Sequence, residues 1–182
     1  QAFLRQREGS SMSDSPQRVL ITGVHGLVGN AIYRRLVQFP SRYTVFGLTR
    51  RRQSSSRLPQ QHLQAVPAAR LLIADIADMA AVQKAMQGMD VVVHMAANPN
   101  GEAEWESVLQ NNIVGSYNVF EACRQAGVKR VIYASSVQVI LGYGKDEPYA
   151  SLLSGDPAVV PPIDCAPVTH LQPTRPLNLY AS

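Results

Sequence analysis

The stretch RVLITGVHGLVGN, residues 18–30, decides how the chain is expected to fold. It opens with an apolar run, Arg18–Thr22, that ends at a glycine and therefore predicts a buried strand. Three glycines follow at GxxGxxG spacing, and these are Gly23, Gly26 and Gly29. Apolar residues then recur at every fourth position, as on one face of a helix; they are Val28, Ile32 and Leu36, with Ala31 beside them. The stretch predicts a strand, a tight turn and a helix that stops before Pro40.

The same alternation of strand and helix continues along the chain. Apolar runs predict four further strands, at residues 43–48, 70–76, 90–97 and 129–136. Two helices are expected between them, one capped by Asp78 and stopped by Gly88, the other running over residues 105–126 and closed by Gly127. Because runs such as Val91–Val93 are continuously apolar, the sheet is expected to be parallel and covered on both faces. Residues 16–142 therefore predict an α/β, Rossmann-like domain with a doubly wound parallel sheet.

The spacing of the three glycines has a chemical meaning between a strand and a helix. The first permits the sharp turn, the second lets the backbone approach a pyrophosphate, and the third lets the helix pack on the strand. Free amides and the positive end of the helix then face the anion. The cofactor contacts predicted here are Gly23, His25, Gly26, Leu27, Val28 and Gly29. The alternatives are a tight turn without a ligand and a His25 that is only an exposed loop residue.

The residues after the second strand indicate which dinucleotide is favoured. An acid about 20 residues beyond the glycines would bind the ribose 2′-hydroxyl of NAD, but the chain has Thr49 there, followed by Arg50, Arg51 and Arg52. Arginine forms paired, charge-assisted hydrogen bonds to a phosphate such as the 2′-phosphate of NADP. Thr49, Arg50 and Arg51 are therefore predicted to bind the cofactor, with NADP favoured and NAD possible. The alternative is a basic loop that faces solvent.

Composition argues against several other classes of protein. No apolar run in the 182 residues approaches the ~18 needed to cross a bilayer, so no membrane partner is expected. The two cysteines lack CxxC spacing and the four histidines are scattered. This pattern predicts no metal site and no disulfide framework, and it favours a cytoplasmic location. Residues 1–15 are polar and are interpreted as a disordered tag or leader.

The positive charge of the chain is concentrated in its first part. Residues 1–70 contain eleven Lys and Arg against two acids, and a basic half is one mark of nucleic-acid binding. The arginines at residues 50–52, however, lie where a cofactor phosphate is expected. No nucleic-acid partner is therefore predicted.

The composition changes after residue 142. Seven of the twelve prolines fall within residues 143–176, and proline resists both helices and central strands. This segment is predicted to be a long surface loop or flap.

Several stretches together resemble a known family. They are TGVHGLVG, HMAA at residues 94–97, NNIVGSYNVFEACRQAGVKRVIYASS and the terminal RPLNLY. They resemble the extended short-chain dehydrogenase/reductases, the NAD-dependent epimerase/dehydratase group, over residues 18–142 and again over 175–182. The resemblance implies that Asp75 and Ile76 flank the adenine, and that three residues after the fourth strand line the cofactor; these are Ala96, Ala97 and Asn98. Each of these residues also has a purely structural alternative, such as capping or packing.

The resemblance also implies an active site. Asn112 would order the active site and contact the cofactor, and Ser136 would hydrogen-bond the reacting oxygen of the substrate. Tyr180 would be the tyrosine of a Tyr-x-x-x-Lys motif and would also contact the cofactor. A tyrosine with its reference pKa of ~10 is ionised in roughly one molecule per thousand at pH 7. A nearby ammonium would favour the phenolate, which explains a lysine one helical turn later. The alternative is an ordinary tyrosine in a tail.

The sequence stops two residues after Tyr180, before the position of that lysine. Residues 177–182 are therefore interpreted as the start of the catalytic tyrosine helix, with a C-terminal substrate region absent and the fragment inactive as written. The intact protein is expected to be an NAD(P)-dependent oxidoreductase whose substrate is a small sugar, sugar acid or nucleotide sugar. A homodimer is its candidate assembly. A nucleotide-sugar epimerase or dehydratase with retained NAD and a non-catalytic NAD(P) sensor are the alternatives.

Overall fold

Five parallel strands form one sheet in the order β3-β2-β1-β4-β5. Their bounds are β1 Gln17–Thr22, β2 Tyr43–Thr49, β3 Leu71–Ile73, β4 Val91–His94 and β5 Arg130–Tyr133. The computed structural model describes residues 15–156, 158–159 and 165–182, so residues 1–14 of the predicted leader lie outside the described residues. The central strand pairs on both sides, with Leu20 of β1 opposite Phe46 of β2 and Val92 of β4. The predicted parallel α/β sheet is therefore confirmed.

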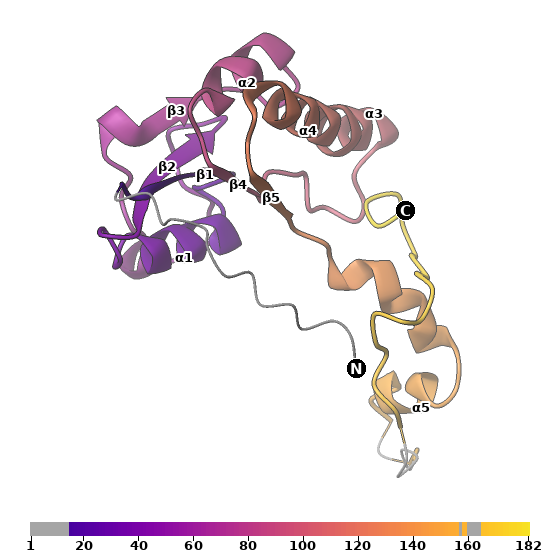
Figure 1. Ribbon diagram of the computed structural model, residues 1–182. Coiled ribbons are helices and arrows are strands. Elements are labelled where there is room, and N and C mark those ends of the chain that lie inside the picture. Colours follow the sequence, from indigo (N-terminus) through magenta and orange to yellow (C-terminus); the bar gives the residue numbers. More distant parts are fainter. Residues whose placement is uncertain (1–14, 157, 160–164) are drawn as a thin grey trace, which may run out of the picture.

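Helices cover both faces of this sheet (Figure 1). On one face lies α1, Leu27–Leu36, which packs with Val19, Ile21 and Val45 of the central strands. On the other lie α2, Met79–Met86, and α4, Gly115–Ala126, whose buried residues join Leu20 and Val92 in the larger core cluster. This is the doubly wound arrangement that the alternating pattern predicts.

The sequence signals for helix ends are visible in the structure. The Asp78 carboxylate accepts a hydrogen bond from the Ala81 amide at 3.1 Å and so caps α2. The long predicted helix runs over α3, Trp105–Val108, then η3, a π-helical turn over Leu109–Val114, and then α4. It ends at Gly127, whose φ of 70° is the left-handed conformation that glycine adopts at helix ends.

Two details of the first helix and the last strand differ from the prediction. Val28 and Ala31 were expected on the buried face of α1, but both are exposed, and the buried residues of the helix are Gly29, Asn30 and Tyr33. The helix is rotated about its axis so that Gly29 lies against Gly23 and Val24, while Tyr33 packs between the helix and the sheet. Strand β5 is the edge of the sheet and is not covered on both faces, since three of its four residues are exposed.

The proline-rich segment is not a loop throughout. A 3-10 helix, η4, occupies Val137–Lys145 and a short helix, α5, occupies Tyr149–Leu153. Residues 165–176 run back beside these two helices. The Tyr143 hydroxyl donates to the Pro173 carbonyl at 3.0 Å, and the Tyr149 hydroxyl donates to the Ala166 carbonyl at 2.8 Å. We call residues 137–156 with 165–176 the arm, which projects from the sheet in Figure 1.

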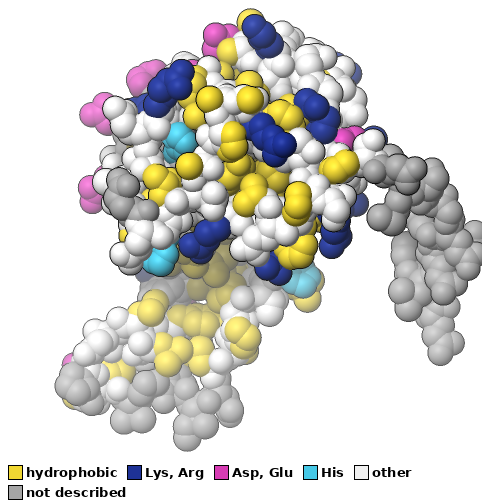
Figure 2. Space-filling view, turned by 90° about the vertical axis from the view of Figure 1, so that its left-hand side faces the viewer, with side chains coloured by type: hydrophobic (Ala, Val, Ile, Leu, Met, Phe, Trp, Pro, Cys, Tyr) yellow, Lys and Arg dark blue, Asp and Glu magenta, His cyan; other side chains and the backbone are white. Residues whose placement is uncertain are grey.

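Two further short 3-10 helices, η1 at Gln60–His62 and η2 at Ala68–Arg70, interrupt the connection between β2 and β3. No helix in the described part of the chain is both long and apolar enough to cross a membrane. Figure 2 shows the Lys and Arg side chains of one face lying in separate groups among apolar and neutral ones.

Candidate active site

The candidate site lies at the carboxyl edge of the sheet, where the chain order reverses between β1 and β4. In open parallel sheets this reversal leaves a crevice beyond the strand ends, where ligands bind. The glycine turn follows β1, and the turn of Met95 to Asn98 follows β4. Both connections therefore meet at the crevice.

The glycine turn is so tight that side chains are excluded from two of its positions. Gly23 has a φ of 68°, and a Cβ there would lie 2.9 Å from the Ala96 amide nitrogen. A Cβ on Gly29 would lie 2.3 Å from the Gly23 carbonyl oxygen. At Gly26 the nearest atom to such a Cβ is the same oxygen, at 3.1 Å. Gly23 and Gly29 therefore let the first helix, the first strand and the turn after β4 come together.

The first turn of α1 has no side chain that caps its backbone amides. Its N-cap, Gly26, makes no side-chain hydrogen bond, and the first turn contains no acidic residue. Leu27 and Val28, which open the helix, are 50% and 59% exposed. The first amides of a helix have no partner within it, and they carry the positive end of its dipole. The predicted contacts Leu27 and Val28 thus lie at an open, electropositive helix end.

A buried asparagine that the sequence analysis did not single out holds this end of the helix. Asn30 is fully buried, donates to the carbonyls of Val24 and Gln64, and accepts from the Gln64 amide at 2.9 Å. A polar residue within an apolar helical face was the available signal, because buried amides need partners. Asn30 therefore fixes α1 to both the glycine turn and the connection after β2.

The loop after β2 folds back onto the glycine turn. Thr49 donates to the Arg51 carbonyl at 3.0 Å, and His25 Nδ1 lies 3.1 Å from the same oxygen. Since a carbonyl only accepts, Nδ1 of His25 carries the proton in this contact. The Ser55 amide donates to the His25 carbonyl at 2.9 Å. The structure thus brings His25, Thr49 and Arg51 together, with His25 bonded to the loop.

Arg50 and Asp75 lie next to one another beyond β2 and β3. The Arg50 guanidinium donates to the Asn111 side-chain oxygen at 2.8 Å and lies 3.8 Å from the Asp75 carboxylate. Ile76, which was predicted to flank the adenine, has its side chain buried in the core against Gly115. Of this predicted pair, only Asp75 has a side chain at the site.

A buried network joins the end of β1 to the turn after β4. Thr22 Oγ1 lies 2.7 Å from His94 Nδ1 and accepts from the Met95 and Ala96 amides, both at 3.1 Å. Because both amides donate, the Thr22 hydroxyl gives its one proton to His94, and the other ring nitrogen faces Ser116 Oγ at 3.3 Å. Burial lowers the pKa of His94 to about 4, so the ring is neutral at pH 7. This network holds the main chain of the predicted cofactor-lining turn.

The predicted residues Asn98 and Asn112 bind each other directly. The Asn98 amide donates to Asn112 Oδ1 at 2.8 Å, and Asn112 Nδ2 donates to the Asn98 carbonyl at 3.1 Å. Asn112 lies on the π-helical turn η3, and such turns are frequent at functional sites. Ala96 and Ala97 precede this pair, with Ala97 exposed. The pair fixes the end of the turn to the helix.

Ser136 and Tyr180 come from opposite ends of the arm. Ser136 Oγ accepts from the Gln138 amide at 3.2 Å, so its hydroxyl proton is available to another acceptor. Gln138 accepts from the Asn178 side chain at 2.6 Å, and Asn178 Oδ1 accepts from the Ala181 amide at 3.1 Å, as an N-cap does. The arm therefore brings the Tyr180 turn back beside the segment that follows β5.

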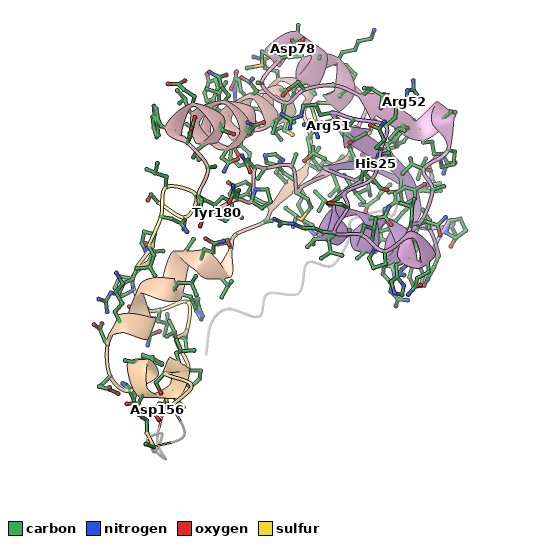
Figure 3. All side chains as sticks on the ribbon, turned by 180° about the vertical axis from the view of Figure 1, so that it is seen from behind. His25, Arg51, Arg52, Asp78, Asp156 and Tyr180 are labelled. Carbon is green, nitrogen blue, oxygen red and sulfur yellow. The ribbon has the colours of Figure 1, made fainter. Side chains whose placement is uncertain are left out.

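Figure 3 shows Tyr180 well separated from His25 and Arg51, which lie together. A Cβ on Gly101, after β4, would lie 2.7 Å from Asn178 Nδ2, so the Tyr180 segment also touches the β4 connection. The predicted residues thus lie in two groups, which are the glycine turn with the arginine loop and the joined segments that carry Ser136 and Tyr180. A separate cavity of about 190 Å³ lies between α1 and residues 58–62, and it is smaller than the roughly 300 Å³ at which ligand sites begin.

The fold and the glycine turn define this chain as a Rossmann-like nucleotide-binding domain of the doubly wound class. The model of the NAD dependent epimerase/dehydratase family matches residues 19–163, and the chain belongs to that family.

Known relatives match about three quarters of the chain. The chain is 37% identical over 127 residues to NAD-dependent glucose-6-phosphate dehydrogenase of Haloferax volcanii, which covers 70% of this chain and 46% of that protein. It is 34% identical over 137 residues to uronate dehydrogenase of Pseudomonas putida, covering 75% and 47%. A solved UDP-galactose 4-epimerase superposes with a TM-score of 0.65 at 26% identity, covering 91% of this chain and 47% of that one. The chain spans about half the length of the curated relatives it matches.

Proposed function

We propose that this chain is the coenzyme-binding part of an NAD(P)-dependent oxidoreductase that acts on a sugar, sugar acid or nucleotide sugar. The observation that carries the proposal is the uncapped N-terminus of α1, which opens at the glycine turn beside the turn after β4. The sugar and sugar-acid dehydrogenases among the relatives support the substrate class.

The residues at the crevice fit a dinucleotide. The amides at the start of α1, with no acid in the first turn, suit a diphosphate. Thr49, Arg50 and Asp75 lie on the side where the adenosine of such a ligand would extend. The turn held by Asn98 and Asn112 follows β4. We propose NADP as the favoured coenzyme, because Thr49 stands where an acid would select NAD, and arginines follow it.

We propose that Ser136 and Tyr180 handle the proton of the reaction. The coenzyme, when bound, supplies or accepts the hydride. The free hydroxyl proton of Ser136 is suited to a hydrogen bond with the reacting oxygen of the substrate, and Tyr180 is suited to proton exchange with that oxygen. A lysine four residues after Tyr180 would favour its phenolate, and this chain ends before that position.

The proposal is tested by titrating the chain with NAD and with NADP by calorimetry, and by repeating both titrations with Gly26→Asp. Aspartate is a favourable N-cap, so this variant should fold, while its carboxylate occupies and repels the predicted diphosphate position. We expect its affinity for both coenzymes to fall about tenfold or more. Ala158→Asp is the control, because Ala158 is exposed and the charge change is the same. No binding by the parent chain, or equal binding by Gly26→Asp, would refute the coenzyme site.

The catalytic assignment is tested in a chain extended to the full length of the relatives. A Tyr180→Phe variant of that protein should lose most of its turnover, because the proton donor is removed, while coenzyme affinity stays close to that of the parent. Near-normal turnover would rule out Tyr180 as the proton donor.

A second candidate is a nucleotide-sugar epimerase or dehydratase that retains NAD, and the likeness to UDP-galactose 4-epimerase favours it. Acid denaturation of the purified extended protein, followed by an enzymatic assay for released NAD, separates the two. Stoichiometric NAD in the supernatant would support the epimerase and count against a dehydrogenase that exchanges its coenzyme.

We also propose that the intact protein is a homodimer that uses the outer face of α4 and its neighbours. Tyr117 and Phe120 of α4 are exposed, and Phe120 stacks edge-on with Tyr133 of β5 at a ring distance of 5.3 Å. A continuous exposed aromatic face of this kind is typical of an interaction surface. Sedimentation velocity of the extended protein should show a dimer, and Tyr117→Lys should shift it toward the monomer; a monomeric parent would contradict the proposal.

A further inference from the structure

Arg50 is already bonded to a residue 61 positions away in the sequence. Its Nη1 donates to Asn111 Oδ1 at 2.8 Å, and the same nitrogen lies 3.8 Å from Asp75 Oδ2. About half of the Arg50 side chain is exposed, so the guanidinium can leave this position without opening the core. The arginine that stands first in the predicted phosphate-binding run is thus held by an amide and a carboxylate.

The hydrogen bonds of Asn111 show that its side-chain oxygen faces Arg50. Its Nδ2 donates to the Ser107 carbonyl at 2.8 Å, and only the amide nitrogen can donate there. The oxygen of the same amide must therefore point to Arg50. Two independent partners, one on each side, fix Asn111 as an acceptor for the guanidinium.

Asn111 belongs to the same hydrogen-bonded group as the turn after β4. Ser107 Oγ accepts from Asn98 Nδ2 at 2.7 Å, and Asn98 is in turn bonded through its backbone to Asn112, the neighbour of Asn111 on the π-helical turn. The bonds therefore run from Arg50 through Asn111 and Ser107 to Asn98. Arg50 is thus joined to the turn after β4 by a series of hydrogen bonds.

We propose that Asn111 and the 2′-phosphate of NADP compete for the Arg50 guanidinium, which makes Asn111 a residue that sets coenzyme specificity. This inference rests on the proposed function, because it requires a dinucleotide in the crevice. With NAD, which has no 2′-phosphate, the bond between Arg50 and Asn111 can persist. With NADP, Arg50 binds the dianionic phosphate better than a neutral amide, so each NADP molecule bound breaks the bond to Asn111.

The competition predicts opposite effects for two substitutions at one position. Asn111→Ala removes the hydrogen-bonded acceptor and leaves Arg50 only its longer contact with Asp75, at 3.8 Å. We therefore expect NADP to bind about three- to tenfold more tightly while NAD affinity changes little. Asn111→Asp places a charged acceptor against Arg50, so we expect NADP to bind more weakly by a similar factor. Asn111→Ala and Asn111→Asp both lose the hydrogen bond from the Asn111 amide nitrogen to the Ser107 carbonyl. The loss of this bond therefore cannot explain NADP affinities that change in opposite directions.

The test is a set of calorimetric titrations of the 182-residue chain with NAD and NADP, for the parent, Asn111→Ala, Asn111→Asp, Arg50→Ala and the double variant Arg50→Ala/Asn111→Ala. In the Arg50→Ala background, Asn111→Ala should leave NADP affinity unchanged, because the group that the two acceptors share is gone. Arg57→Ala, which removes an exposed positive charge further along the same connection, controls for general loss of charge.

The decisive quantity is the ratio of NAD to NADP dissociation constants. A ratio that rises in Asn111→Ala, falls in Asn111→Asp and does not respond to Asn111→Ala without Arg50 supports the competition. Equal shifts for both coenzymes, or an effect of Asn111→Ala that persists in the Arg50→Ala background, would overturn it while leaving the coenzyme site intact. Failure of the parent to bind either coenzyme would overturn the proposed function and this inference together.

Discussion

The Thr22→Val substitution tests how strongly the end of β1 holds the turn after β4. Valine has nearly the shape of threonine but lacks the hydroxyl, so the change leaves three groups without their partner. They are the acceptor nitrogen of His94 and the amides of Met95 and Ala96. Thr22 and His94 are almost completely buried, so water does not readily replace the lost bond between them.

The expected cost follows from those three groups. An unsatisfied buried donor or acceptor costs about 1–3 kcal/mol. The His94 nitrogen is fully enclosed, whereas the two amides share one oxygen and are only partly buried, so the lower end of the range applies to them. The total is about 3–5 kcal/mol, which is a large part of the 5–15 kcal/mol by which most domains are stable.

The assay is urea unfolding of the parent chain and three variants, followed by circular dichroism. Thr22→Ser keeps the hydroxyl and loses one methyl group, so it should cost only about 1 kcal/mol. Thr44→Val makes the same chemical change on the neighbouring strand β2, at a partly exposed position, and should change stability by less than about 0.5 kcal/mol. If Thr22→Val cost no more than Thr44→Val, the hydroxyl would not be the centre of this network.

Three further predictions concern the same domain. Burial lowers the pKa of His94 from 6.5 to about 4, so between these pH values the unfolded chain binds a proton at His94 and the folded chain does not. The free energy of unfolding should therefore fall by on the order of 3 kcal/mol as the pH drops from 6.5 to 4. Urea unfolding at several pH values should show a weaker pH dependence for His94→Asn. The Cβ of Gly29→Ala would lie 2.3 Å from the Gly23 carbonyl oxygen, so this variant should lower the free energy of unfolding by about 1–3 kcal/mol in the same assay. An unchanged urea midpoint would contradict the close packing of Gly29 against Gly23. Asp78→Ala removes the cap of α2 and should cost about 1 kcal/mol, whereas Asp78→Asn should restore most of it.

The sequence was sufficient to predict most of the sheet, because its signals are local. Apolar runs bounded by turn residues mark each strand, and Asp78 and Gly127 mark helix ends through rules that involve only three or four neighbouring residues. The face of α1 could not be predicted in the same way. A period of four residues favoured Val28, but the close contact between Gly29 and Gly23 turned the helix and buried Asn30.

Residues of the candidate site could be proposed one by one from the sequence, but their hydrogen-bond partners could not. Thr22 and His94 lie 72 positions apart, and they meet only because β1 pairs with β4. Arg50 could be placed after β2, yet its bond to Asn111 depends on the path of a helix that begins more than 50 residues later. Strand order decides both contacts, and local periodicity does not determine strand order.

The two ends of the crevice are held in different ways, and this difference has consequences for how the site can change. The coenzyme end is built on strand ends and a buried network, so few of its side chains can vary without a cost in stability. Ser136 and Tyr180 instead depend on the Gln138–Asn178 hydrogen bond and on the packing of Gly101 against it, at the base of a projecting arm. Sequence changes in the arm can therefore move Ser136 and Tyr180 while the end at the glycine turn keeps its geometry. Substrate range is then expected to follow the arm, and coenzyme preference to follow Arg50 and its partner on the π-helical turn.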